Sequence, residues 1–151
     1  MKQSAGILLY KVQKTELYVL LIHPGGPFFA KKDAGAWSVP KGEFEKAEDP
    51  LAAAKREFQE ETGKKIDGDF IPLKSVKQKS GKLVQVWAVK GELDVSEICS
   101  NLFEMEWPPR SGKKQSFPEI DRAEWFTLEE AIQKIIPAQR AFLEELDQLL
   151  K

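Results

Sequence analysis

The stretch GEFEKAEDPLAAAKREFQEETGK, from Gly42 to Lys64, organises the interpretation of the whole chain. Its first residues predict a loop, because the glycine and the charges around it interrupt any regular period. A helix is expected from Asp49, a good N-cap, and Pro50, which suits the first helical turn. Gly63 supplies the expected helix stop.

The expected helix has two adjoining faces when it is wound at about 100° per residue. An apolar face can pack on a core and carries Leu51, Ala54, Phe58 and Thr62. An acidic face carries Glu57, Glu60 and Glu61, whose charges repel by a few tenths of a kcal/mol per i,i+4 pair in an exposed helix. This face is either solvated and paired with neighbouring basic residues or built to bind a cation, since Mg²⁺ prefers carboxylate oxygens.

The spacing of these residues resembles the Nudix box, G-x5-E-x7-R-E-U-x-E-E-x-G-U, in which U is a bulky apolar residue. The matching residues are Gly42, Glu48, Arg56, Glu57, Phe58, Glu60, Glu61 and Gly63. At background usage of about 5–7% per residue type, seven fixed positions coincide by chance on the order of once in 10⁸ starts. Lys64 departs from the last apolar position, and Ile66 is the candidate for that packing contact.

The resemblance implies a loop–helix–loop that binds divalent cations, in a hydrolase that cleaves a pyrophosphate bond in a nucleoside diphosphate linked to another group. We expect Mg²⁺ as the cofactor, with Mn²⁺ as the alternative. The expected metal ligands are the side chains of Glu57, Glu60 and Glu61 and, by the resemblance, the backbone carbonyl of Gly42. Arg56 and Glu48 are interpreted as supporting residues, because a guanidinium can fork onto a carboxylate and fix its rotamer.

Two carboxylates are candidates for the general base. Glu57 lies within the box, but a carboxylate saturated by a metal ion is a weak base. Glu119 precedes an aromatic strand, as does the distant catalytic glutamate of diadenosine tetraphosphate hydrolases, which it resembles. Its other interpretation is a surface carboxylate at a strand edge.

Basic residues in loops are candidates for phosphate contacts. Lys41 adjoins the box and resembles a phosphate contact in related hydrolases, while Lys113 and Lys114 lie in a glycine-containing segment. Further candidates of the same kind are Lys31, Lys32 and Arg110. Most loop lysines are merely solvated.

Three other residues have open interpretations. Phe28 and Phe29 are expected either to stack on a base or to pack the loop onto the core. His23, the only histidine, is expected to hydrogen-bond to backbone at the end of a strand rather than to touch substrate.

Composition sets wider limits on the protein. A chain of 151 residues, 42% hydrophobic and 31% charged, suits a single globular Nudix domain spanning 1–151. Its formal net charge of −1 favours neither nucleic acid nor membrane. The expected partner is therefore a small nucleotide, with an RNA 5′ end as the one nucleic-acid exception and no membrane.

Cys99 is the only cysteine, which suits a cytoplasmic protein, and the N-terminal apolar run suggests a strand rather than a signal peptide. A monomer and a homodimer are both open.

The remaining patterns predict an α/β/α sandwich with a mixed sheet. Strands are expected at 4–12, 17–23, 37–39, 70–79, 82–90 and 122–126, and 91–117 is expected to be irregular. A helix should begin at Thr127 with Glu130 in a capping box, and another at Pro137. The second helix should bury a stripe of Phe142, Leu146, Leu149 and Leu150. Continuous apolar strands need helices on both faces, hairpins require antiparallel pairs, and the Nudix fold has the same architecture.

Three functional hypotheses remain at this point. The first is a pyrophosphohydrolase, with a dinucleoside polyphosphate or an NTP as its leading substrate. ADP-ribose and capped or triphosphorylated RNA ends are also open. The others are a non-catalytic nucleotide-binding or sensing module, and a helical interaction protein that uses its C-terminal stripe.

Overall fold

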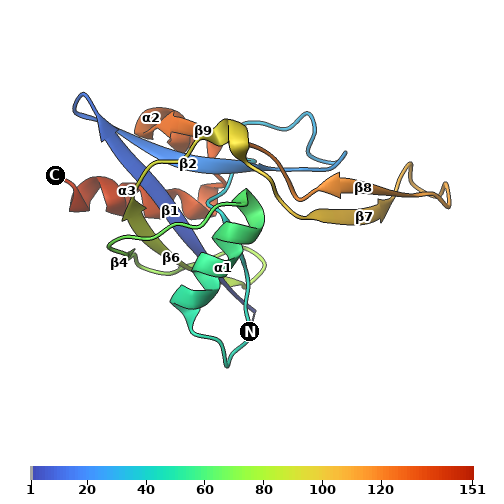
Figure 1. The fold of residues 1–151 in the computed structure, drawn as a ribbon, viewed down its shortest axis with the longest axis horizontal. Coiled ribbons are helices and arrows are strands. Elements are labelled where there is room, and N and C mark those ends of the chain that lie inside the picture. Colours follow the sequence, from blue (N-terminus) through green and yellow to red (C-terminus); the bar gives the residue numbers. More distant parts are fainter. Residues whose placement is uncertain (1) are drawn as a thin grey trace.

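The computed structural model describes residues 2–151 and shows a mixed sheet with helices on both faces (Figure 1). β1 (Gln3–Gln13) pairs antiparallel with β2 (Glu16–Pro24) and parallel with β6 (Leu83–Lys90). β9 (Ile120–Thr127) pairs antiparallel with the other side of β2. The expected α/β/α class and mixed sheet are confirmed.

Short strands complete the sheet around this path. β3 (Lys41–Glu43) pairs with β1, whereas β4 (Ile71–Pro72) and β5 (Val76–Lys77) pair with β6. The predicted single strand at 70–79 is wrong, because the segment forms the two short strands β4 and β5 instead. Pro72 has no N–H with which to continue the hydrogen bonds of the ladder. The expected strand at 37–39 is reduced to isolated bridges.

The helices begin and end near the expected residues. α1 (Pro50–Thr62) is capped by the Asp49 carboxylate, which accepts the Ala52 N–H at 3.0 Å, and ends at Gly63 with φ 76°. α2 (Leu128–Lys134) begins with the expected capping box of Thr127 and Glu130. Pro137 opens a 3₁₀ turn, η2 (Pro137–Gln139), which leads into α3 (Arg140–Leu149). Another 3₁₀ turn is η1 (Val95–Glu97). No helix within residues 2–151 combines the length and apolar character needed to span a membrane.

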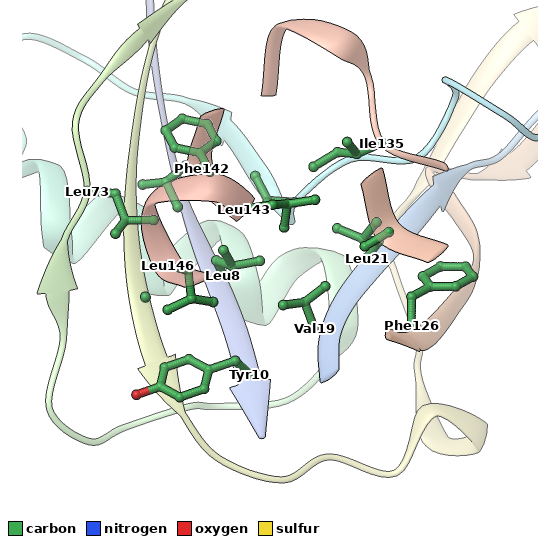
Figure 2. Packing of buried hydrophobic residues seen from close by; sticks show 14 of the residues in the cluster. Leu8, Tyr10, Val19, Leu21, Leu73, Phe126, Ile135, Phe142, Leu143 and Leu146 are labelled. Carbon is green, nitrogen blue, oxygen red and sulfur yellow. The ribbon is translucent and has the colours of Figure 1, made fainter. Parts of the chain in front are cut away.

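The sheet separates two apolar cores. Ile7 and Leu9 of β1 join the core that contains Phe58 of α1. Alternate residues face the other core, where α3 buries Phe142, Leu143 and Leu146 against β1 and β2 (Figure 2). The expected α3 stripe is wrong at its end: Leu149 and Leu150 are 50% and 41% exposed, because the helix terminates there.

A two-stranded hairpin, here called the arm, projects from the body beyond β2 and β9 (Figure 1). It consists of β7 (Leu102–Glu106) and β8 (Lys114–Pro118), so the prediction of an irregular 91–117 segment is wrong for these two strands. Phe103 and Met105 are half-buried, whereas Glu104 and Glu106 are exposed. That alternation follows the period of a strand.

Candidate active site

Arg56 connects three carboxylates of the acidic region. Its Nε and Nη2 donate to the two oxygens of Glu48 at 2.9 and 3.0 Å, which is the fork expected from the sequence. Its Nη1 donates to Glu57 Oε1 at 2.8 Å and to Glu60 Oε1 at 3.2 Å. Arg56 therefore fixes two of the expected ligands from one side, while each keeps its other oxygen.

The acidic face is not paired with lysines of the following turn among the described residues. Lys64 instead bonds Glu97 at 2.8 Å, and Ile66 packs against the core beside α1, as expected. Of the pairs that the solvated interpretation predicts, Arg56–Glu60 is present, whereas the acidic face forms none with a lysine of the following turn.

Gly42 brings the backbone of β3 against α1. A Cβ built on this residue would overlap the carboxylate of Glu57. Residue 42 must therefore be glycine for the strand and the Glu57 carboxylate to occupy these positions. The backbone of Gly42 consequently lies beside the acidic cluster, as the sequence predicted.

Glu61 is the most buried carboxylate of the cluster. Its Oε1 accepts the Lys41 N–H at 2.9 Å. Burial raises the pKa of the Glu61 carboxyl to about 8; the Lys41 N–H opposes this shift, and the charges of Glu57 and Glu119 add to it. Burial, followed by the charge of Glu60, also raises the pKa of Glu57. The cluster is therefore short of positive charge.

Lys41 contributes to this electrostatic balance from the adjoining strand. Burial lowers the pKa of its ammonium, and the nearby Lys82 lowers it further. Lys82 itself lies 3.4 Å from Glu43, and sequence reasoning did not single it out. Its contribution follows from pairing β5 and β6 beside β1, which no local pattern reveals.

Glu119 lies between β8 and β9, and its charge acts on both Glu57 and Glu61. Its position is held by backbone hydrogen bonds: its N–H donates to Asn101 C=O at 2.9 Å, and its C=O accepts the Gly25 N–H at 2.8 Å. The charge of this distant glutamate therefore reaches two carboxylates of the box.

Residues 99–101, here called the strap, link Glu119 to α1. The Cys99 and Asn101 N–H groups donate to the carbonyls of Thr62 and Glu60 at 3.0 and 3.3 Å. The Ser100 hydroxyl accepts the Ile120 N–H at 3.0 Å and donates to the Ile120 carbonyl at 3.2 Å. Sequence analysis missed the strap, because backbone bonds between distant segments leave no residue pattern.

The donor set fits a divalent cation in its chemistry. Carboxylate oxygens and a backbone carbonyl are hard ligands, and a cation would favour the charged form of Glu61 that burial disfavours. Within residues 2–151, no three acidic, histidine or cysteine side chains are placed so that together they could hold a metal ion. Arg56 holds one oxygen each of Glu57 and Glu60 instead.

The other sequence candidates lie apart from this cluster. Lys113 and Lys114 lie at the outer end of the arm, which projects away from α1 (Figure 1). His23 is fully buried, with Nε2 2.6 Å from the Lys32 carbonyl and Nδ1 2.8 Å from Asp121 Oδ1, as expected for a structural histidine. Phe28 is 60% exposed, so it does not pack the loop onto either core.

Known proteins are similar to this chain over most of its length. A family model described as the NUDIX domain matches residues 1–146. The chain is 34% identical over 125 residues to an RNA pyrophosphohydrolase of Brucella anthropi, covering 73% of this chain and 67% of that protein. It is 30% identical over 125 residues to an RNA pyrophosphohydrolase of Rhizobium meliloti, covering 73% and 70%.

Solved structures share the fold at lower sequence identity. A C. elegans Ap4A hydrolase binary complex superposes with a TM-score of 0.65 at 21% identity, over 99% of this chain and 98% of that one. The NUDIX domain of Shewanella oneidensis NrtR, complexed with ADP ribose, gives 0.66 at 14% identity, over 99% and 88%. At these identities the likeness concerns the fold alone.

Proposed function

This chain belongs to the Nudix family, and we propose that its substrate is a nucleotide with a 5′-polyphosphate, foremost the triphosphorylated 5′ end of an RNA. It is a hydrolase that cleaves a pyrophosphate bond in a nucleotide-linked substrate. The observation that carries the proposal is the group of α1 carboxylates that Arg56 links, packed against the Gly42 backbone.

Glu57, Glu60, Glu61 and the carbonyl of Gly42 would hold a divalent cation, which we propose to be Mg²⁺ rather than Mn²⁺. Such a cation neutralises phosphate oxygens and lowers the pKa of a bound water. Arg56 orients Glu57 and Glu60 through its own bonds, and Glu48 holds Arg56 in place.

The remaining roles follow from position. The charge of Glu119 acts on Glu57 and Glu61, and Arg56 does not hold its carboxylate, so Glu119 is our candidate to accept a proton from the attacking water. Lys41, buried beside Glu61, is the candidate for contact with a phosphate oxygen. The site itself discriminates little between nucleosides, because these residues meet only phosphate and water.

Relatives support an RNA end over the dinucleoside polyphosphate first favoured by sequence. The two relatives at 34% and 30% identity are both named RNA pyrophosphohydrolases. The Ap4A hydrolase likeness, at 21% identity, does not extend beyond the fold. We place the reaction in the cytoplasm, which the unpaired Cys99 supports, and propose a monomer or a homodimer as the acting form.

A substrate panel tests this proposal. Triphosphorylated RNA, diadenosine tetraphosphate, NTPs and ADP-ribose would each be incubated with the protein and Mg²⁺ or Mn²⁺. We expect turnover that falls by at least about tenfold in Glu60→Gln, whereas Glu144→Gln, on the exposed side of α3, retains it. Equal turnover in Glu60→Gln and the wild type would reject the metal role. Failure to hydrolyse any member of the panel would reject the substrate class.

A further inference from the structure

We propose that the arm and residues 25–32, here called the aromatic loop, form a binding site for single-stranded RNA. On the proposed function, on which this inference rests, the site holds the nucleotides that follow the 5′ end processed at the acidic cluster.

The aromatic loop runs along the arm from a backbone contact with Glu119. The Gly25 N–H bonds the Glu119 carbonyl at 2.8 Å. A Cβ on Gly26 would lie 2.8 Å from Phe103 Cζ, so the next residue packs directly on β7. Phe28 then meets Trp107 edge to face, with ring centroids 5.5 Å apart. A chain that leaves the cluster beside Glu119 therefore has a continuous surface ahead of it.

That surface exposes aromatic rings. Phe28 and Phe29 are 60% and 39% exposed, and neither belongs to the two cores. Trp107 is half-buried against Phe28 and also lies outside both cores. Because every base has a π-face, exposed aromatic rings provide stacking positions for single-stranded nucleic acid regardless of sequence.

Positive charge accompanies these rings. Residues 27–32 and 107–113 contain no aspartate or glutamate, and their cations are Lys31, Lys32, Arg110 and Lys113. Within the part of the chain that the structure describes, none of the four belongs to an ion pair. In a chain of formal net charge −1, this concentration of unpaired cations favours a polyanion at this place.

The two faces of the arm differ. Phe103 pairs with Phe117, and the ladder continues as the Trp107 N–H donates to the Lys113 carbonyl at 3.0 Å. Alternation therefore puts Trp107 and Lys113 on the face of the aromatic loop. Lys114 pairs with Glu106 on the opposite face. The two adjacent lysines are thus a matched pair, of which one faces the proposed site.

The distribution of charge identifies RNA as the occupant. Cations continue to the outer end of the arm, and β8 alone, with five residues, is about 15 Å long. RNA carries a phosphate at every nucleotide and matches charge spread over that length. The phosphates of a dinucleoside polyphosphate all lie between its two nucleosides, and those would be engaged at the acidic cluster.

Two RNA probes of identical sequence, about eight nucleotides long, separate the arm from the reaction. One carries a 5′-triphosphate and reports KM and kcat, with diadenosine tetraphosphate as the comparison substrate. The other carries a 5′-hydroxyl and a 3′ fluorophore and reports Kd by anisotropy, without requiring hydrolysis. The variants are Phe28→Ala, Lys113→Ala and Lys114→Ala in the full chain, each checked for folding by circular dichroism.

We expect Phe28→Ala to raise both the Kd for hydroxyl RNA and the KM for triphosphate RNA by about tenfold. The KM for diadenosine tetraphosphate should not change. Lys113→Ala should reduce the slope of log Kd against log salt by about 0.7, whereas Lys114→Ala should leave it near the wild-type value.

The inference is overturned if Phe28→Ala leaves binding of hydroxyl RNA unchanged, or if it raises the KM for diadenosine tetraphosphate equally. The latter result would mean that the rings stack on a distal nucleoside. Failure of the proposed function is a separate result: no hydrolysis of the panel, while hydroxyl RNA still binds in a Phe28-dependent way, would support the arm as an RNA site and reject the substrate assignment.

Discussion

Gly42 and Glu57 are packed so closely that a methyl group on Gly42 would overlap the Glu57 carboxylate. One residue belongs to β3, which is held by β1, and the other to α1, which buries Phe58 against the same sheet. The distance between strand and helix therefore leaves room for the Glu57 carboxylate but for no side chain on residue 42. This contact fixes one wall of the acidic cluster.

Gly42→Ala should lower kcat by at least about tenfold, because the added methyl group must displace either β3 or the Glu57 carboxylate. Steady-state kinetics on triphosphorylated RNA measures the effect. Gly35→Ala is the control: its φ of 76° also disfavours a side chain, but a Cβ there meets nothing within 4 Å. Wild-type kcat in Gly42→Ala would show that the cluster tolerates a displaced Glu57.

Arg56→Lys should weaken divalent-metal binding by about 10–100-fold, because a lysine cannot hold both oxygens of Glu48 and also reach Glu57 and Glu60. Titration with Mn²⁺, followed by electron paramagnetic resonance, measures the affinity directly. Glu48→Gln should have a smaller effect in the same direction. The double variant should lose less than the product of the two single effects, and strict additivity would contradict the connection between them.

The helix that carries the acidic face could be predicted because its information is local. Asp49, Gly63 and the spacing of Glu57, Glu60 and Glu61 each act within a turn or two of the chain. The capping box at Thr127 is local in the same way. Such signals depend on backbone groups that every helix must satisfy at its ends.

The arm and the strap could not be predicted with the same rules. Leu102–Glu106 does alternate with the period of a strand, but prolines and a glycine between the two strands favour a loop. Ser100 has no distinguishing neighbours in the sequence, since its role depends on Ile120, 20 residues away. Contacts formed by folding decide both cases.

Asp33 should contribute stability that is lost on acidification. Its carboxylate bonds the Lys134 ammonium and accepts the Trp37 Nε1–H at 2.8 Å, and these bonds lower its pKa below the ordinary value of 3.8. A lowered folded-state pKa means that the stabilisation is complete above about pH 4 and disappears as the pH falls through the folded value.

Thermal unfolding between pH 7 and pH 2.5, followed by circular dichroism, tests this. Asp33→Asn should have a lower Tm than the wild type at pH 7, and the difference should shrink toward zero at the acid end. Asp69→Asn, at an exposed position, should have the Tm of the wild type at every pH. A difference in Tm between Asp33→Asn and the wild type that stays constant with pH would contradict the linkage.

Glu119→Gln should lower kcat by about 10²–10³-fold, because the amide cannot accept a proton from water. The carboxamide preserves the size of the side chain, and the backbone bonds to Asn101 and Gly25 remain available. The metal affinity of Glu119→Gln should stay near that of the wild type, whereas Glu60→Gln, which changes a proposed metal ligand, should lower it. An unchanged kcat would leave Glu57 as the remaining carboxylate candidate for the base.

Ser100→Ala should lower kcat several-fold while leaving KM and metal affinity unchanged. Its hydroxyl holds both backbone groups of Ile120, the residue after Glu119, while the neighbouring strap residues bind the carbonyls of α1. Without the hydrogen bonds of Ser100 to Ile120, Glu119 is free to move relative to the carboxylates of α1. Proton transfer depends on the distance between the base and the attacking water, so kcat should fall. Ser100→Thr keeps the hydroxyl and should restore most of kcat.

Ser96→Ala, which changes an exposed serine in η1 that bonds Asp94, is the matched control and should leave kcat unchanged. A loss of thermal stability with an intact kcat in Ser100→Ala would assign the strap a structural role only.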